Sequence, residues 1–294
     1  MDPSLCGFLV LDKPAGLTSH SCVGRVRRAF GIRRVGHGGT LDPAVTGVLP
    51  IAVGPATRLL PYLQGDKLYR GTVQLGLTTR SDDLQGQVLR TAPLPPLDAA
   101  ALEQALAGFR GPILQRPPQV SAVHVDGERA HVRSRRGEEL ELAPRPVTVH
   151  RLELLDWDPE RGRLDLLVGC SAGTYIRSLA RDLGERLGCG GALASLRRLE
   201  ALGFGLEGAV GLEELDASPP PLLDPLTALS HLPRHPLSPP QLLDWRCGRR
   251  LEAAADHPTD GAVAVIGPDG RLAGIARADG AGGLQPKLVF EAAG

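Results

Sequence analysis

The sequence lacks an apolar run long enough to cross a membrane. The longest one near its start covers residues 7–11 (GFLVL), and Asp12 and Lys13 end it at once. A membrane-spanning helix needs about 20 apolar residues, and the core of a signal peptide needs about 7–15. We therefore expect a cytoplasmic protein without a membrane segment.

Cysteines are few, and no pattern pairs them. There are five, an odd number, and no two of them form a CxxC pair. They are Cys6, Cys22, Cys170, Cys189 and Cys247. A disulfide framework or a zinc site needs paired or clustered cysteines. We expect reduced thiols and no bound metal.

Acidic residues are absent between Lys13 and Leu41, although the net charge of the whole chain is zero. The basic residues of that segment are Lys13, Arg25, Arg27, Arg28, Arg33 and Arg34, and a second basic stretch holds Arg129, Arg133, Arg135 and Arg136. Local basic patches bind nucleic-acid phosphates even when acids elsewhere cancel the total charge. A solvated, arginine-biased surface explains the same pattern, because lysine is rare throughout. Composition leaves both interpretations open.

The chain of 294 residues is long enough for one large domain and a small one, and its 42% hydrophobic content is ordinary for a globular protein. Periodicity predicts strands at residues 7–13, 48–54, 67–76, 146–157 and 163–171, and helices at 19–30, 57–64, 97–109 and 173–188. The short turn between the last two strands predicts antiparallel pairing, and Asp126-Gly127 predicts a hairpin. The proline-rich segment 217–226 is expected to be an extended arm. Glycine-rich turns after about Pro236 predict a small β domain, so the fold is expected to be α+β with a mixed sheet.

Asp42 lies in the segment GHGGTLDPAVTG, after three glycines and before Pro43. Asp-Pro is a common turn initiator, which explains the pair without any function. Glycines also let a backbone approach a ligand closely, and His37 adds a polar side chain to the same loop. The residues alone leave a turn and a binding site both open.

Arg177 falls in the first turn of the helix predicted after Thr174. The helix dipole disfavours a cation there by about 0.3–1 kcal/mol. An arginine at such a position often has an anionic partner, either a carboxylate or a phosphate, and a solvated arginine is the alternative. Tyr69 shares a strand face with Val73 and Leu75, which favours a core aromatic over a base-stacking residue.

The segment GCSAG around Ser171 matches the nucleophile elbow of esterases, between a predicted strand and a predicted helix. Histidines that could complete a triad follow at His231, His235 and His257. An α/β-hydrolase needs a parallel sheet of repeated βαβ units, however, whereas these strands are expected to be linked as hairpins. An esterase is therefore the alternative interpretation.

Several motifs follow one another in a fixed order along nearly the whole chain. They are GFLVLDKPAGLTSH, RVGHGGTLDPAVTGVLPIAVGPATRLLPYL, KLYRGTVQLGLTTRSDD, RPPQVSAVHVDGERAH, CSAGTYIRSLARDLGERLG and LRRLEALGF. In this order they resemble the TruB family, the tRNA pseudouridine-55 synthases. The resemblance implies a mixed, largely antiparallel catalytic sheet of the pseudouridine-synthase type over residues 1–233. It also implies a small PUA-like β domain that binds RNA over residues 234–294.

The resemblance also implies roles for matching residues. Asp42 matches the essential aspartate that attacks or stabilises the nucleoside while the glycosidic bond breaks, and Arg177 matches the arginine that pairs with it. Tyr69 matches the tyrosine that stacks on the target base. His37 matches the histidine that helps hold the flipped-out nucleotide. Asp83 matches an acid that anchors the arginine.

Further matches surround these residues. Leu196 matches an apolar residue beside the base, and Lys13 with Pro14 matches the DKP segment that supports the active-site loop. Arg34, in the basic stretch, is expected to contact RNA. Some positions depart from the family pattern. Gly38 stands where Thr is usual, the RSDD segment that leads to Asp83 is looser than usual, and His124 and His131 replace an expected Lys and Tyr in a tRNA-contacting segment.

The implied activity is isomerisation of a tRNA T-loop uridine, at position 55, to pseudouridine. The base leaves C1′, turns and rejoins through C5, which needs neither cofactor nor metal. A paired arginine favours the charged form of a carboxylate, and a stacked target must be flipped out against an aromatic platform and a basic surface. We expect a monomer that needs no protein partner. A non-catalytic tRNA-binding protein is the remaining alternative.

Overall fold

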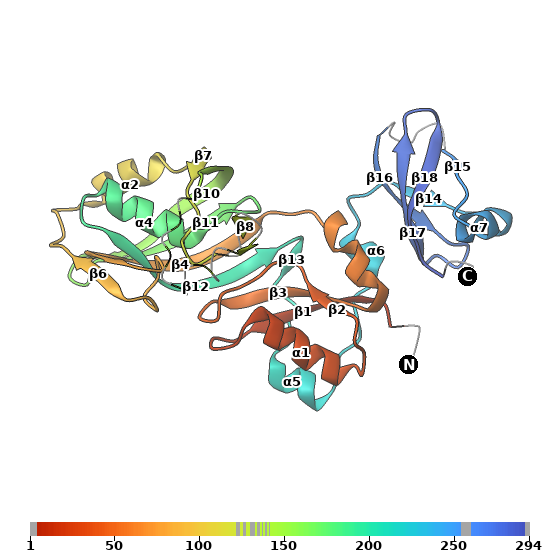
Figure 1. Cartoon of the computed structure of the whole chain (residues 1–294), viewed down its shortest axis with the longest axis horizontal. Coiled ribbons are helices and arrows are strands. Elements are labelled where there is room, and N and C mark those ends of the chain that lie inside the picture. Colours follow the sequence, from red (N-terminus) through yellow and green to blue (C-terminus); the bar gives the residue numbers. More distant parts are fainter. Residues whose placement is uncertain are drawn as a thin grey trace.

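The computed structural model describes residues 5–121, 124–125, 128–129, 133, 136, 138, 140, 142–253 and 260–291. Figure 1 shows an elongated molecule with a large sheet and its helices at one end and a smaller sheet at the other. No helix in the described part is long and apolar enough to span a membrane.

The described residues of the large sheet form nine strands in the order β1-β3-β12-β4-β11-β10-β7, with β2 beside β3 and β13 beside β12. Their bounds are β1 Gly7–Lys13, β2 Val35–His37, β3 Thr46–Val53, β4 Lys67–Leu75, β7 Gly111–Gln115, β10 Arg145–Asp158, β11 Arg163–Cys170, β12 Gly191–Ala201 and β13 Phe204–Gly205. The pairing of β3 with β12 is parallel, and the other described pairings of this sheet are antiparallel. The predicted mixed, largely antiparallel sheet is confirmed.

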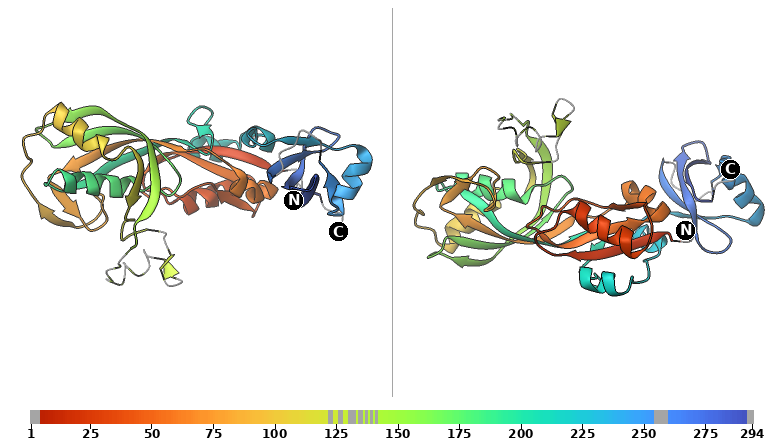
Figure 2. Two further views of the ribbon diagram at one scale, coloured as in Figure 1. Left: turned by 90° about the horizontal axis from the view of Figure 1, so that it is seen from above. Right: turned by 60° about the horizontal axis from the view of Figure 1, so that its bottom comes forward.

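Helices cover the sheet in two places. α2 (Ala99–Ala107) and α4 (Ile176–Arg186) bury their apolar side chains against β4, β10 and β11. α1 (Ser19–Ala29) and α5 (Leu212–Ala217) pack together beside β1 and β3 at the bottom of Figure 1, and the right view of Figure 2 turns this side forward. α1 begins where Thr18 Oγ1 accepts a hydrogen bond from the Ser21 amide at 3.0 Å, and it ends before Gly31, whose φ of +62° suits glycine.

Two local predictions were wrong in detail. The helix expected at 57–64 is a 3₁₀ helix, η1 (Gly54–Tyr62), which starts earlier at a Gly-Pro pair. The loop expected over 36–47 is shorter, because its two ends extend β2 and β3. Small hairpins are formed by β5 (Leu77–Thr79) with β6 (Val88–Thr91) and by β8 (His124–Val125) with β9 (Glu128–Arg129). The second confirms the hairpin predicted at residues 126–127, which themselves lie outside the described residues.

The predicted extended arm runs beside β1, where Phe8 and Leu223 exchange backbone hydrogen bonds of 2.9 and 2.7 Å. A short helix, α6 (Pro225–Ala228), follows, and then the second sheet begins. In the described residues this sheet has five strands in the order β14-β16-β17-β18-β15, which confirms a C-terminal β unit. The strands are β14 Arg234–Pro236, β15 Leu251–Glu252, β16 Asp260–Ile266, β17 Leu272–Asp279 and β18 Gly283–Val289.

One helix that was not predicted, α7 (Pro239–Arg246), closes the core of the second sheet. Its Trp245 is fully buried, and the indole nitrogen donates to the Ala273 carbonyl at 2.9 Å. The two sheets share apolar contacts, because Ile275 and Leu288 belong to the same buried cluster as Phe8 of β1. The smaller sheet is therefore packed against the larger unit.

Candidate active site

Asp42 lies in the loop between β2 and β3, and the structure holds that loop at several points. Leu41 is buried in the core, and its amide donates to Ser19 Oγ of α1 at 2.8 Å. The Asp42 carbonyl accepts from the Val45 amide at 3.0 Å, which closes the turn at Pro43. The buried Leu41 and this turn direct the Asp42 side chain outward, where 44% of it is exposed. A carboxylate is thus presented on a fixed backbone.

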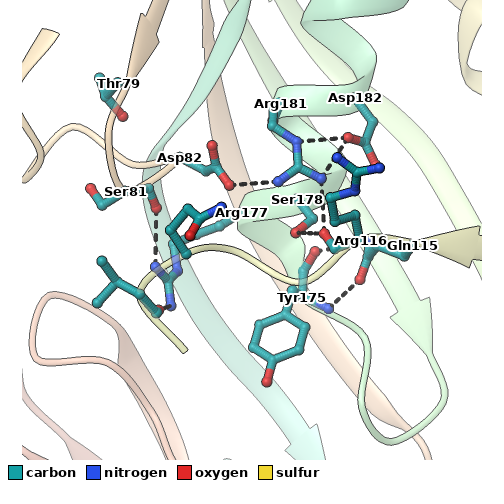
Figure 3. Close-up of polar contacts among 12 residues, drawn as sticks. Thr79, Ser81, Asp82, Gln115, Arg116, Tyr175, Arg177, Ser178, Arg181 and Asp182 are labelled. Carbon is teal, nitrogen blue, oxygen red and sulfur yellow. Dashed lines mark hydrogen bonds and ion pairs between the residues drawn. The ribbon is translucent and has the colours of Figure 1, made fainter. Parts of the chain in front are cut away.

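Arg177 is the second residue of α4, and its guanidinium is almost fully buried. Nη2 lies 3.0 Å from Asp42 Oδ2 and also donates to the Val120 carbonyl at 2.9 Å. Nη1 donates to the Ser81 carbonyl at 3.0 Å, as Figure 3 shows. The structure therefore brings together Asp42 and Arg177, as the sequence interpretation required, and supplies an anion at the helix N-terminus where the dipole opposes the cation.

Asp83 lies on the other side of the same guanidinium. Its Oδ2 is 3.8 Å from Arg177 Nε, whereas its Oδ1 accepts from Ser81 Oγ at 2.6 Å and from the Gln85 amide at 3.0 Å. Asp83 is therefore fixed by its own loop and places a second negative charge beside Arg177. The arginine lies between two carboxylates and two carbonyls, which restricts its orientation.

A second arginine–carboxylate pair lies one helical turn further along α4. Arg181 Nη1 is 2.8 Å from Asp82 Oδ2, and Nη2 is 2.8 Å from Asp182 Oδ1 (Figure 3). Asp82 has a left-handed φ of +61°, which turns its side chain away from that of Asp83. Burial raises the pKa of Asp82, and Arg181 opposes that rise. The pair could not be identified from the sequence, although Asp82 and Asp83 are adjacent in the chain.

Lys13 holds the far side of the Asp42 turn. Its side chain is fully buried at the end of β1, and Nζ donates to the carbonyls of Pro14, Leu17 and Pro43 at 2.8, 2.7 and 3.2 Å. Pro43 follows Asp42 directly, so the ammonium fixes the backbone next to the carboxylate. Burial lowers the pKa of Lys13, and the nearby Asp42 counteracts that effect.

Tyr69 and Leu196 lie on neighbouring strands beside this cluster. Tyr69 is only 5% exposed and belongs to the same buried cluster as Leu41, as the plain interpretation of its strand face predicted. Burial raises the pKa of its hydroxyl, and nearby Arg198 opposes that rise. Leu196 is half-buried on β12, and its Cδ1 lies over Gly71 of β4. Both side chains belong to, or pack against, the buried cluster that contains Leu41.

His37 and Arg34 lie on the approach to the Asp42 loop. His37 is half-buried at the end of β2, and its Nδ1 accepts from the Gly39 amide at 3.4 Å. Burial lowers the pKa of His37, with smaller contributions from Arg198 and His20. Arg34 is exposed, and its Nε donates to Thr57 Oγ1 at 2.9 Å, so it faces η1 and not the Asp42–Arg177 pair.

The basic stretch is only partly paired within the protein. Arg25 forms an ion pair with Asp216 of α5, and Arg27 donates to the Val35 carbonyl at 3.2 Å. Arg28 and Arg33 are exposed. The side chains of His124, His131 and Arg129 lie outside the described residues.

Ser171, the nucleophile of the esterase interpretation, is hydrogen-bonded to the backbone of β10. Its Oγ accepts from the Thr148 amide at 2.9 Å, and its own amide donates to the Thr148 carbonyl at 2.9 Å. These bonds continue the antiparallel pairing of β10 and β11, whereas a hydrolase needs a parallel sheet. Within the described residues, no group of three or more histidine, cysteine or acidic side chains is placed to hold a metal ion.

Two residues beside the pair were missed by the sequence analysis. Tyr175, at the N-cap of α4, is close enough to Asp42 and Arg177 for both to influence its hydroxyl, and burial raises the pKa of that hydroxyl. Arg198 on β12 is fully buried and donates to the Gly39 and Val48 carbonyls at either end of the Asp42 loop. The motif LRRLEALGF contains two adjacent arginines, and nothing in it indicates which of them is buried.

Comparison with known proteins places these motifs in one family. Residues 27–176 match the model of the N-terminal domain of TruB family pseudouridylate synthases, and residues 177–219 match that of the tRNA pseudouridylate synthase B C-terminal domain. Residues 233–290 match the model of the C-terminal part of pseudouridine synthase II TruB.

Whole-length relatives agree with the family models. The tRNA pseudouridine synthase B of Parasynechococcus marenigrum (strain WH8102) is 66% identical over 288 residues, which are 98% of each chain. That of Gloeobacter violaceus (strain ATCC 29082 / PCC 7421) is 48% identical over 97% of this chain and 98% of its own. A Cbf5-Nop10-Gar1 complex has the same fold, with a TM-score of 0.71 and 24% identity over 97% of this chain and 84% of that chain.

Proposed function

The chain belongs to the TruB family of pseudouridylate synthases and isomerises uridine to pseudouridine in tRNA, and we propose that it acts on position 55 of the T loop with Asp42 as its catalytic carboxylate. The observation that supports this role is the 3.0 Å contact between Asp42 Oδ2 and Arg177 Nη2. It joins an exposed carboxylate to a buried, fully engaged guanidinium.

The reaction breaks the bond between C1′ and N1 of the uridine, turns the uracil, and forms a bond between C1′ and C5. The proton on C5 is released and N1 takes up a proton from solvent, so the product is an isomer of uridine and no electrons are gained or lost overall. A carboxylate beside the sugar can form an ester, stabilise positive charge at C1′ or remove the C5 proton. Because Arg177 holds Oδ2, the other oxygen of Asp42 is the one presented to the nucleoside.

The other residues act around this carboxylate. Lys13 supports the loop through the Pro43 carbonyl, the Pro14 carbonyl accepts from the same ammonium, and Asp83 anchors Arg177. Tyr69 and Leu196 contact the uracil. Because Tyr69 is 5% exposed in this structure, stacking of a base on its ring requires its neighbours to move when RNA binds.

Basic and polar surface residues hold the flipped-out nucleotide and the RNA around it. His37 contacts the flipped-out nucleotide, and Arg34 with exposed Arg28 and Arg33 contacts phosphates. Residues 1–233 form the catalytic domain, and residues 234–294 form an RNA-binding domain. The protein acts in the cytoplasm as a monomer, without a protein partner or a cofactor.

The decisive experiment uses T-arm RNA that carries tritium at C5 of uridine. Wild-type protein should release the tritium, and Asp42→Asn should bind the RNA but release none. Asp156→Asn serves as the matched control, because Asp156 is an exposed aspartate of β10, and it should behave as wild type. Absence of release by wild type, or unchanged release by Asp42→Asn, would refute the proposal and leave a tRNA-binding protein.

A further inference from the structure

Arg198 is a buried cation without a carboxylate partner among the described residues. Its side chain is fully buried in the middle of β12. Burial of a charge is costly unless hydrogen bonds compensate for the lost water. Here Nε donates to the Val48 carbonyl at 2.7 Å and Nη2 donates to the Gly39 carbonyl at 3.1 Å, whereas Nη1 is buried without a hydrogen-bond partner. Such an expensive arrangement calls for an explanation beyond packing.

The two carbonyls that Arg198 holds lie on either side of Asp42. Gly39 precedes the aspartate by three residues, and Val48 is the third residue of β3, after the turn. Backbone contacts reinforce the connection: a side chain at Gly47, whose φ is +101°, would place its Cβ only 2.1 Å from the Arg198 carbonyl oxygen. A Cβ at Gly39 would lie 3.5 Å from Nη1. The loop thus lies directly against Arg198 at both ends.

Arg198 also faces Tyr69. The two residues are paired across β12 and β4, and the Tyr69 hydroxyl partly offsets the effect of burial, which lowers the pKa of Arg198. One side chain therefore contacts the loop that carries the catalytic carboxylate and adjoins the aromatic residue proposed to meet the base. Arg197, its neighbour, has none of these contacts. It is 40% exposed and pairs with Asp12 at 2.6 Å.

We propose that Arg198 is a positioning residue that fixes the Asp42 loop relative to Tyr69 by holding the carbonyls of Gly39 and Val48. The proposal rests on the proposed role of Asp42. Arg198 itself does not touch the substrate, because it is fully buried. Its function is to keep the Asp42 carboxylate and the Tyr69 ring in fixed relative positions, so that Asp42 reaches the sugar while Tyr69 contacts the base.

The test compares Arg198→Lys and Arg198→Met with Arg197→Lys as the matched control. Lysine keeps the charge but replaces the separate Nε and Nη2 donors by one ammonium on a flexible chain, so the two carbonyls lose their fixed spacing, and methionine removes the charge. In single-turnover tritium release, Arg198→Lys should be about 10²-fold slower, since a misplacement of about 1 Å costs that much. Its Kd for T-arm RNA should stay within about threefold of wild type, and Arg197→Lys should match wild type in both measurements.

A second measurement is independent of activity. Hydrogen exchange at the amides of Leu41 and Val45, which are hydrogen-bonded within the loop, should be faster in Arg198→Lys and unchanged in Arg197→Lys. If Arg198→Met fails to fold, the lysine variant still tests whether Arg198 positions the Asp42 loop. Tritium release by Arg198→Lys at the wild-type rate, or slower release with unchanged hydrogen exchange in the loop, would overturn the proposal.

The outcomes separate this proposal from the proposed function. If wild type releases no tritium, the proposed function fails, and loop exchange alone decides whether Arg198 positions the loop. The link to Tyr69 is tested by combining Arg198→Lys with Tyr69→Phe. The losses of rate should not add in the double variant, because the two residues would act as one unit. Strict additivity would remove Tyr69 from the proposal.

Discussion

The substitution Arg177→Lys tests whether the site needs the several donor nitrogens of a guanidinium or only its positive charge. Arg177 distributes three nitrogens over the Ser81 and Val120 carbonyls, Asp42 and Asp83. A lysine ammonium is one nitrogen on a flexible chain and cannot reach all four groups. At least one buried carbonyl then loses its donor, and the carboxylate of Asp42 loses its fixed contact.

The magnitudes follow from these contacts. One or two unsatisfied buried carbonyls cost about 1–3 kcal/mol each, so we expect unfolding to require about 2–4 kcal/mol less. If Asp42 moves by about 1 Å, the single-turnover rate constant should fall about 10²-fold, which corresponds to about 2.7 kcal/mol in the activation free energy. The affinity for T-arm RNA should change little, because Arg177 is buried.

Arg181→Lys is the matched control for this experiment. Arg181 is on the same helix, its side chain is 19% exposed, and it binds Asp82, Asp182 and the Arg116 carbonyl at 2.8 Å each. Its replacement should cost similar stability but leave the rate constant within about threefold of wild type. The assay is tritium release with enzyme in excess, alongside urea unfolding. Equal slowing by both variants, or no slowing by Arg177→Lys, would refute the reasoning.

Two further predictions concern stability. Because burial lowers the pKa of His37 below its ordinary value of 6.5, the unfolded chain binds that proton more tightly, and stability falls as pH decreases from 6.5 through the lowered value. Between pH 7.5 and 5.5, urea unfolding of wild type should therefore lose more stability than that of His37→Gln, and equal losses would contradict the effect. Gly47→Ala should lower stability by about 3 kcal/mol or more, since its Cβ would clash with the Arg198 carbonyl. Gly173→Ala has a similar φ of +87° but open space, so it should cost only about 1–2 kcal/mol, and equal costs would exclude the clash.

Periodicity predicted a helix or a hairpin correctly where the local sequence alone determines that element. α4 was predicted from its apolar spacing, and the prediction placed Arg177 in its first turn, where the dipole argument indicated an anion. The β10–β11 hairpin was predicted from two strands and a short turn. The pairing of Asp42 with Arg177, which are far apart in the chain, came from the family resemblance and not from periodicity.

Elements that depend on tertiary contacts were missed. β12 (Gly191–Ala201) is rich in Ala, Leu and Arg, which have modest strand propensity, and it forms a strand because it fills the position between β3 and β4. Within it, register shifts next to Leu193 and Arg198 decide which side chains are buried. Adjacent arginines in a sequence give no means of predicting that one is fully buried and the other is 40% exposed.

The anchors of the Asp42 loop come from widely separated parts of the chain, and this fixes the order in which the site can be completed during synthesis. Lys13 and Ser19 leave the ribosome before the aspartate, whereas Arg177 and Arg198 emerge more than a hundred residues after it. A nascent chain that ends before β12 carries Asp42 and Arg177 but lacks Arg198, which holds the Gly39 and Val48 carbonyls of the loop. We therefore expect an unfinished chain not to modify tRNA before β12 has taken its place between β3 and β4.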